Sequence, residues 1–295
     1  MGIGSQIPLL DVPILLLAGF GAGVVGSAAG LASLISYPVL LAIGLPPVTA
    51  NVTNTVALIG SSIGSVSGSR LELRGQDDLR RHLPVAMLGG AAGAALLLLG
   101  PPGTFQRLVP YLVAGASLLL LTGPRLRKLR GRRTADTRSD DTRSDDTRTV
   151  DLRSADVRSV DLRSAGQEFG PTANPVRRPQ SIGVRVGLFL TCLYGGYFGA
   201  AAGVMILALL LTATGKSLPR ANAAKNLLLG VANATAAVGF GVFADVRWAA
   251  VIPLGLGCVA GGVVGPAIVR RLPPDLVRIA IGIAGLALAV DLAVT

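Results

Sequence analysis

Polar side chains inside otherwise apolar segments are the residues of this chain with the greatest chemical capacity. Amide, hydroxyl and ammonium groups are expensive at membrane depth, so they often face a partner or a cavity. No Asp or Glu stands at the centre of any apolar segment, which argues against a proton relay and favours the binding of a small oxyanion. We therefore predict substrate-binding residues in both halves of the chain: Asn51, Asn54 and Thr55, and Asn222, Lys225 and Asn226.

These polar residues also have a simpler interpretation. Amide and hydroxyl side chains in membrane helices commonly make hydrogen bonds between helices, without any ligand. The ammonium group of Lys225 can reach the membrane surface along its flexible stem. Both alternatives stay open at the level of the sequence.

Closely spaced glycines form the second candidate feature. The stretch GAGVVG, residues 21–26, matches the G-x-G-x-x-G pattern of dinucleotide-binding folds, but it lacks a preceding strand, and residues 27–71 contain no Asp or Glu. Two other readings remain: a small-residue stripe for close helix packing, or a broken helix whose backbone amides line a substrate site. On the second reading the candidate site residues are Gly26, Ser27, Gly30, Gly199 and Gly203.

The elements that would position these residues are apolar helices. The chain has 295 residues, of which 51% are hydrophobic and only 15% are charged. A membrane-spanning helix needs about 20 apolar residues, and the first two segments of each half are too short for one span each. The apolar segments are 13–30, 31–45, 48–69, 83–100 and 105–123, then 183–200, 201–214, 220–243, 248–269 and 276–294.

The two halves repeat each other in order. The pattern Gly23-x-x-Gly26-x-x-x-Gly30 recurs 173 residues later, at 196–203, and the pattern at 89–93 recurs at 261–265. Such ordered self-similarity indicates an internal duplication. We predict an all-α polytopic membrane protein with two homologous arms. The arms form an inverted repeat of about four to five transmembrane segments each, and each arm begins with short or broken helices.

Charge patterning divides the chain into three regions: a first membrane repeat at 1–123, a linker at 124–182 and a second membrane repeat at 183–295. If each short pair crosses the membrane twice, or forms a re-entrant hairpin, all basic loops lie on the cytoplasmic side. If each pair crosses once, the loops at 216–220 and 270–271 lie outside; we favour the first solution. The linker contains six Asp-x-Arg-[Ser/Thr]-x pentapeptides at 136–165, which indicate a disordered cytoplasmic tether rather than a short β-helix.

Several functional classes are disfavoured by composition. The net charge of +11 comes largely from loops and the linker, and aromatic residues make up only 4%, so we expect no nucleic-acid partner. The single histidine and the two cysteines, Cys192 and Cys258, cannot form a zinc site, and we read both thiols as small core residues. No catalytic pair is available at membrane depth, so we expect no enzyme, no metal and no cofactor.

The opening glycine pattern, Gly23, Gly26 and Gly30 with the following Pro38, resembles the TauE/SafE family of sulfite and organosulfonate exporters. The stretch GLPPVTANVTNT at 44–55 is similar to a second motif of that family, and both features recur in the second arm. The resemblance implies a polytopic inner-membrane permease that moves small anions, often sulfur oxyanions. Lys225-Asn226 departs from the pattern, which implies tuned anion binding or a different substrate.

The sequence therefore supports a secondary transporter for a small anion, sulfite or an organosulfonate-type compound, which works by rocking of two inverted repeats around a midplane site. The alternative is a membrane channel, or a non-transporting scaffold whose cytoplasmic loop recruits a partner. We expect a multi-pass protein of the inner (plasma) membrane. Its partners are the lipid bilayer and the anionic substrate, with a homo-oligomer left open.

Overall fold

The computed structural model of the chain is helical throughout its described part, which comprises residues 8, 11–101, 103–115, 117–118, 182–269, 283, 286 and 290. No strand occurs within these ranges, and the predicted all-α fold is confirmed. The first arm contributes α1 (Asp11–Ala29), α2 (Ser33–Ala42), α3 (Pro47–Gly68), the short α4 (Arg70–Leu73) and α5 (Leu79–Leu99). The second arm contributes α7 (Ile182–Tyr197), α8 (Ala202–Thr214), α9 (Leu218–Phe243) and α10 (Trp248–Val269).

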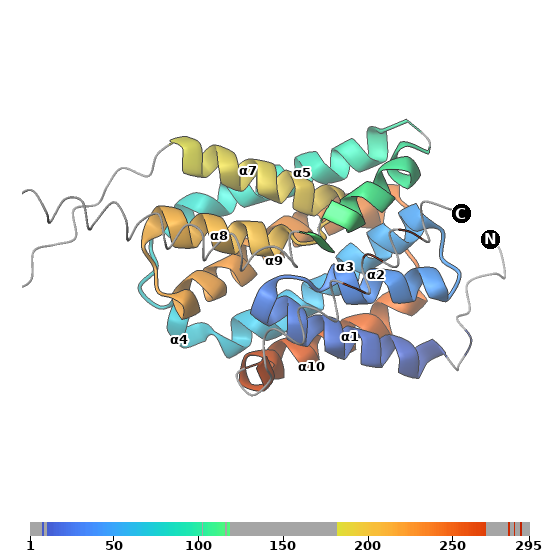
Figure 1. The fold of residues 1–295 in the computed structure, drawn as a ribbon, viewed down its shortest axis with the longest axis horizontal. Coiled ribbons are helices and arrows are strands. Elements are labelled where there is room, and N and C mark those ends of the chain that lie inside the picture. Colours follow the sequence, from blue (N-terminus) through green and yellow to red (C-terminus); the bar gives the residue numbers. More distant parts are fainter. Residues whose placement is uncertain are drawn as a thin grey trace, which may run out of the picture. The chain divides into compact units, whose positions relative to one another are not determined.

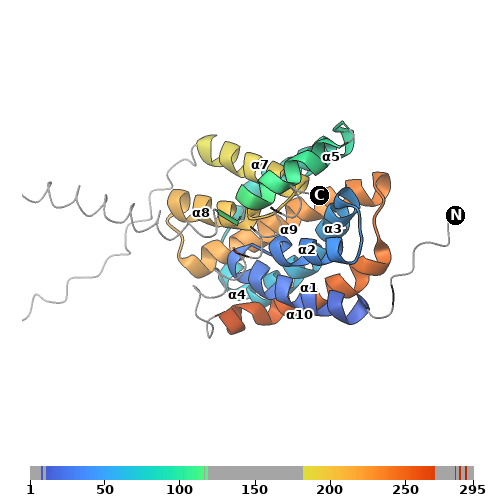
Figure 2. The ribbon, with the colours of Figure 1, turned by 45° about the vertical axis from the view of Figure 1, so that its right-hand side comes forward.

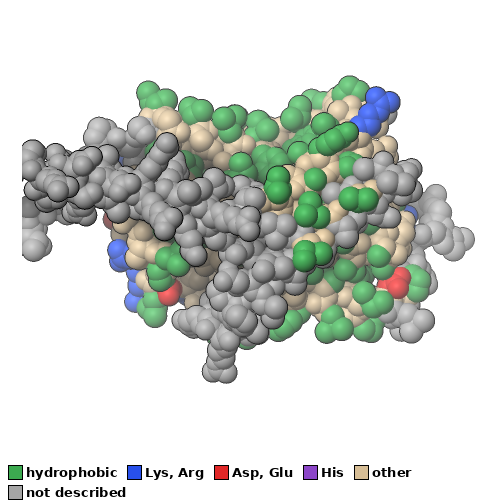
Figure 3. All heavy atoms as spheres, in the orientation of Figure 1, with side chains coloured by type: hydrophobic (Ala, Val, Ile, Leu, Met, Phe, Trp, Pro, Cys, Tyr) green, Lys and Arg blue, Asp and Glu red, His purple; other side chains and the backbone are tan. Residues whose placement is uncertain are grey.

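Four of the described helices are long and apolar enough to cross a membrane: α1, α5, α9 and the Trp248–Gly265 part of α10. Helix α3 has 22 residues but is rich in Asn, Thr and Ser, and most of its side chains are buried. Figure 3 shows hydrophobic side chains over the middle of one face and charged side chains at its two ends, as a bilayer requires. The predicted linker, apart from residue 182, and most of the segment 276–294 lie outside the described residues, so the domain boundaries stay predictions.

Both arms begin with the broken helix pair that the sequence predicts. Gly30 has a φ of 75° and separates α1 from α2, while Gly199 has a φ of 81° and separates α7 from α8. Such positive φ values suit glycine, which has no Cβ to clash with the backbone. Ala201, with a φ of 63°, adopts the same region without that freedom. The chain therefore interrupts each pair with three or four non-helical residues.

The helices pack in two groups that do not follow the sequence repeats. Helix α10, from the second arm, packs on α1 and α3 of the first, and α5, from the first arm, packs on α7 and α9 of the second. Figures 1 and 2 both show α1 beside α10 and α5 beside α7, with the other helices between these pairs. We call α1, α2, α3 and α10 the first bundle and α5, α7, α8 and α9 the second bundle. Each bundle thus contains the fourth long helix of the opposite arm.

Glycines lie at the closest helix–helix contacts inside each bundle, and we call these contacts seams. A Cβ placed on Gly23 of α1 would lie 2.7 Å from the backbone nitrogen of Gly262, and one placed on Gly93 of α5 would lie 2.7 Å from that of Tyr197. Real Cβ atoms do not approach backbone so closely, so these helices pack backbone to backbone. The seams also give the helix directions. Contacts advance in the same sense along α1 and α10, and along α5 and α7, so each pair is parallel.

Helices α3 and α9 run in opposite directions at the centre. The Arg247 amide, just beyond the end of α9, donates to Thr53 Oγ1 near the start of α3, at 3.1 Å. Past the other end of α3, Gln76 Nε2 donates to the Arg220 carbonyl oxygen near the start of α9, at 3.2 Å. These are the directions that an inverted repeat requires, although the superposition of the two arms stays a prediction.

A buried aromatic cluster lies beside the second helix break. The ring of Phe198, just after α7, makes edge contacts with the ring of Tyr37 in α2, at 5.4 Å between centroids, and with that of Phe105, at 5.8 Å. Edge-to-face ring pairs at this separation are favourable beyond the area they bury. The cluster fixes the second break against the first bundle.

Candidate functional site

A cavity lies between the two bundles, where the helix breaks meet. It contains about 470 Å³ of space between atoms, part of it open. Its walls come from both breaks, from the polar face of α3 and from α9. The lining residues are Gly26, Gly30, Ala32, Ser33, Thr55, Leu58, Ser61, Ser62, Ser65, Gly195, Phe198, Gly199, Asn226, Leu229 and Asn233.

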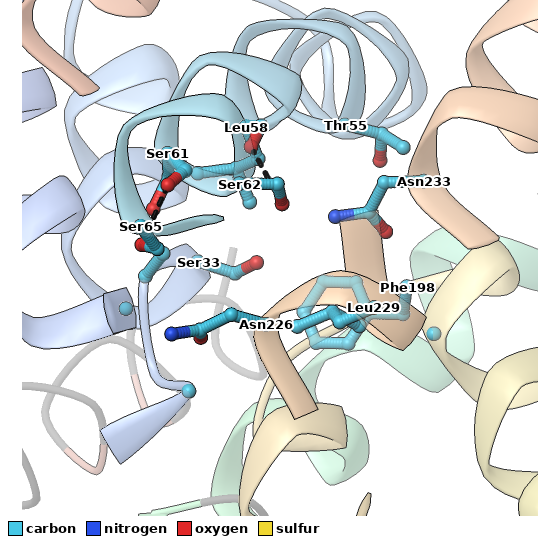
Figure 4. Close-up of a pocket in the computed structure, with 15 residues that line it drawn as sticks. Ser33, Thr55, Leu58, Ser61, Ser62, Ser65, Phe198, Asn226, Leu229 and Asn233 are labelled. Atoms are coloured by element: carbon cyan, nitrogen blue, oxygen red, sulfur yellow. Dashed lines mark hydrogen bonds between the residues drawn. The ribbon is translucent and has the colours of Figure 1, made fainter. Parts of the chain in front are cut away.

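The cavity wall is polar but uncharged: among the described residues that line it, none is ionisable. Figure 4 shows the hydroxyl groups of Ser33 and Ser62 pointing into the space between α3 and α9. Ser33 and Asn233 are only 4% and 5% exposed, and within the described part of the chain neither side chain makes a hydrogen bond. Buried polar groups are normally paired. These two are therefore free to bind a ligand.

Three hydroxyl groups among the described cavity residues bond within α3, and one of them is Ser62 Oγ, which donates to the Leu58 carbonyl oxygen at 3.5 Å. Thr55 Oγ1 donates to the carbonyl oxygen of Asn51, at 3.0 Å, and Ser65 Oγ donates to that of Ser61, at 2.7 Å. Each accepting carbonyl lies four residues earlier in α3, where the helix already supplies a backbone N–H donor. The hydroxyl proton can therefore turn to a ligand in the cavity without leaving the carbonyl unpaired.

The end of α1 is bound by side chains of α9. Lys225 Nζ donates to the carbonyl oxygens of Gly26 and Ser27, at 3.1 and 3.2 Å. Asn222 Nδ2 and Asn226 Nδ2 also donate to the Ser27 oxygen, at 3.0 and 3.1 Å. The last carbonyls of a helix have no partner within it. The second bundle thus caps the first helix of the first bundle.

A neutral counterpart exists on the other side. Asn51 Nδ2, near the start of α3, donates to the carbonyl oxygen of Tyr197, the last residue of α7, at 2.8 Å. Asn51 follows Ala50 in the first arm as Asn222 follows Ala221 in the second, so the two asparagines resemble each other in sequence context. The first bundle therefore caps α7 as the second bundle caps α1, except that only the α1 cap carries a charge.

The predicted site residues divide into two groups. Gly26, Gly30, Thr55, Gly199 and Asn226 line the cavity. The remaining predicted residues surround the cavity. Asn222 and Lys225 donate to the Ser27 carbonyl oxygen, and Asn51 donates to that of Tyr197. Asn54 Oδ1 accepts from Ser36 Oγ at 2.5 Å, and Gly203 contacts Gly30. No ligand is present, so the role of each in substrate binding stays a prediction.

Ser33, Phe198 and Leu229 were not predicted as cavity residues, and neither were the serines 61, 62 and 65 or Asn233. Asn233 lies on the same face of its helix as Asn226, and the three serines lie on the same face of theirs as Asn54. This helical periodicity is visible in the sequence. Ser33 is the first residue of α2, three residues beyond Gly30, so its position follows only once the break is located. Phe198 and Leu229 have no distinguishing pattern, because apolar residues surround them.

Comparison with known proteins places the chain among membrane transporters. The model of a family described as "Sulfite exporter TauE/SafE" matches residues 15–292. The "Probable membrane transporter protein ORF9" of Sinorhizobium sp is 31% identical over 116 residues, which are 38% of this chain and 43% of that protein. A "Probable membrane transporter protein" of Haemophilus influenzae is 32% identical over 130 residues, or 43% of this chain and 48% of the relative.

The "Probable membrane transporter protein YfcA" of Escherichia coli K12 is 28% identical over 120 residues, 40% of this chain and 44% of the relative. The chain thus spans less than half the length of these curated relatives. No solved structure matches it significantly.

Proposed function

We infer the function from one premise: the chain belongs to the sulfite exporter TauE/SafE family. It is accordingly a multi-pass membrane protein of a transporter family. Within this class we propose that it is a secondary transporter of a small anion, sulfite or an organosulfonate-type compound, and that it performs no chemical reaction.

The observation that carries the proposal is the cavity between the two bundles. Its lining offers hydroxyl and amide donors and no carboxylate among the described residues. The N-terminus of α2 adds a favourable field, because helix N-termini attract anions, and Ala32 and Ser33 at that terminus line the cavity. Leu58, Phe198 and Leu229 supply an apolar wall for a short organic group. Such a site suits a small oxyanion with or without a carbon substituent.

The packing suggests how the site would open. Glycine seams hold each bundle together, whereas the most extensive described contact between the bundles is that of α3 with α9. Close-packed units move as rigid bodies more readily than they deform. We propose that the moving bodies are the two bundles rather than the two sequence repeats. Rocking about α3 and α9 would then expose the cavity to each side of the membrane in turn.

Uptake of radiolabelled sulfite into proteoliposomes tests the proposal. The full chain should give saturable uptake above that of empty liposomes, and unlabelled organosulfonates should compete for it. If neither sulfite nor any organosulfonate of a short panel enters above background, the proposed function is wrong. Uptake that rises linearly with concentration, without saturation, would favour the channel alternative.

A further inference from the structure

Lys225 is the one feature of the site that the proposed transport does not explain. Its side chain is fully buried in α9, with an exposed fraction of 0%. An ammonium group buried without compensation is very costly. In the described part of the chain its ammonium has no carboxylate partner, and its recorded acceptors are the carbonyl oxygens of Gly26 and Ser27. The charge is therefore directed at the end of a helix and not into the cavity.

The end of α1 is an unfavourable neighbour for an anion. A helix C-terminus carries about half a negative charge, spread over its unpaired carbonyl groups. Gly26, whose carbonyl Lys225 binds, is itself a cavity-lining residue. The Gly26 oxygen also accepts from the Gly30 N–H, at 2.8 Å. Without the α9 side chains, however, the Ser27 oxygen would be left unpaired, and the negative helix end would repel an anion beside it. Three donors from α9 converge on the Ser27 oxygen alone.

The second break lacks this charge. Asn51, a neutral amide, caps Tyr197 there, and Asn54, three residues further along α3, accepts from Ser36 within the first bundle instead. The two halves of the cavity are thus unequal. The negative helix end beside Gly26 is neutralised by the Lys225 cation, whereas the helix end beside Gly199 is capped only by a neutral amide.

We propose that Lys225 is a positioning residue that makes the site accept anions without touching them. It holds the end of α1 in place and cancels the negative end of that helix where it borders the cavity. The anionic group of the substrate accordingly binds in the half of the cavity formed by Gly26, Ser61 and Asn226, and the half at Phe198 and Gly199 receives the remainder. This inference rests on the proposed function for its transport consequence, although the capping of α1 does not.

The test compares Lys225→Met with two matched variants of the full chain. Lys216→Met removes a positive charge just before α9 without contact to α1, since Lys216 pairs with Asp78 at 2.8 Å. The exchange variant N222K/K225N keeps one lysine and one asparagine on the α9 face that binds Ser27. Hydrogen exchange of the peptide 24–34 in detergent reports the order of the α1 end, and sulfite uptake into proteoliposomes gives KM and maximal rate.

We expect Lys225→Met to speed hydrogen exchange in 24–34 and to raise the KM for sulfite about fivefold, the effect of an uncompensated helix C-terminus on a nearby anion. The maximal rate should change much less, Lys216→Met should resemble the wild type, and N222K/K225N should restore slow exchange and most of the affinity. If Lys225→Met is unstable, N222K/K225N decides alone.

Unchanged exchange in Lys225→Met would overturn the capping role. Faster hydrogen exchange in Lys225→Met with an unchanged KM would overturn the effect on anion binding. So would N222K/K225N with slow hydrogen exchange but a raised KM, since that result means direct contact between Lys225 and the substrate. If the wild-type protein transports no anion, the proposed function fails, and the exchange result still decides whether Lys225 caps α1.

Discussion

Two neighbouring glycines of α1 provide a sharp test of the seam between α1 and α10. A Cβ at Gly23 would lie 2.7 Å from the backbone nitrogen of Gly262 and closer still to the carbonyl oxygen of Cys258. At Gly21, two residues earlier, the nearest atoms are side-chain carbons of Ile35, at 3.7 and 3.9 Å, which is ordinary contact. Substituting Ala for either glycine adds the same methyl group to the same helix. Only Gly23→Ala therefore forces α10 away, by about 1 Å.

The expected energies follow from this difference. Both substitutions gain helix propensity, about 0.5–1 kcal/mol relative to glycine. Gly23→Ala also carries an overpacking cost of about 1–3 kcal/mol, because backbone atoms cannot rotate out of the way. Unfolding of the purified protein by SDS titration should thus find Gly21→Ala at least as stable as the wild type and Gly23→Ala less stable than Gly21→Ala by that amount. Equal stability of the two variants would refute the close seam.

Three further predictions concern the cavity, the linker and the loop before α9. Ser33→Ala and Asn233→Ala should each raise the KM for sulfite about three- to tenfold, the value of one neutral hydrogen bond. Unfolding in SDS should stay nearly unchanged, because neither side chain makes a hydrogen bond within the described part of the chain. A normal KM in both variants would remove them from the site. Deleting residues 136–165 should leave the uptake rate intact, and its loss would mean that the linker is more than a tether. Asp78→Asn should lower stability by less than about 1 kcal/mol, since the Asp78 side chain is 35% exposed and Lys216 keeps its hydrogen bond to Gln76 Oε1. A double-mutant cycle with Lys216→Met measures that coupling.

The helices and their breaks could be predicted from the sequence because they depend on local signals. Apolar runs located eight of the nine described helices to within a few residues, the short α4 being the exception, and Pro47 opens α3 as a first-turn proline should. The offset of 173 pairs Gly30 with Gly203, so it located the second break, at Gly199, only to within a helical turn. These features need no knowledge of what packs against them.

The partners of each helix could not be predicted, since they depend on contacts across the chain. The glycine stripe of α1 illustrates this. Gly23 packs against α10, whereas Gly26 and Gly30 border the cavity, so the packing reading and the broken-helix reading each hold for part of one motif. The exchange of α5 and α10 between the bundles has no local signal. The direction of the Lys225 side chain has no local signal either, because the sequence shows only a charged residue inside an apolar run.

A reversible crosslink between the bundles tests most directly whether anions pass through the cavity between them. A Cβ at Gly230 of α9 would lie 2.6 Å from that of Ser62 in α3, whereas a disulfide needs about 3.5–4.5 Å, so S62C/G230C should form a disulfide across the two bundles once α3 and α9 separate by about 1 Å. A Cβ at Gly239 would lie 3.9 Å from that of Ala94, which makes A94C/G239C a matched crosslink inside the second bundle. The native cysteines are buried.

Sulfite uptake should stop when S62C/G230C is oxidised, return on reduction, and be unaffected by oxidation of A94C/G239C. If fully oxidised S62C/G230C transports as fast as its reduced form, rocking of the bundles around the cavity is not the mechanism.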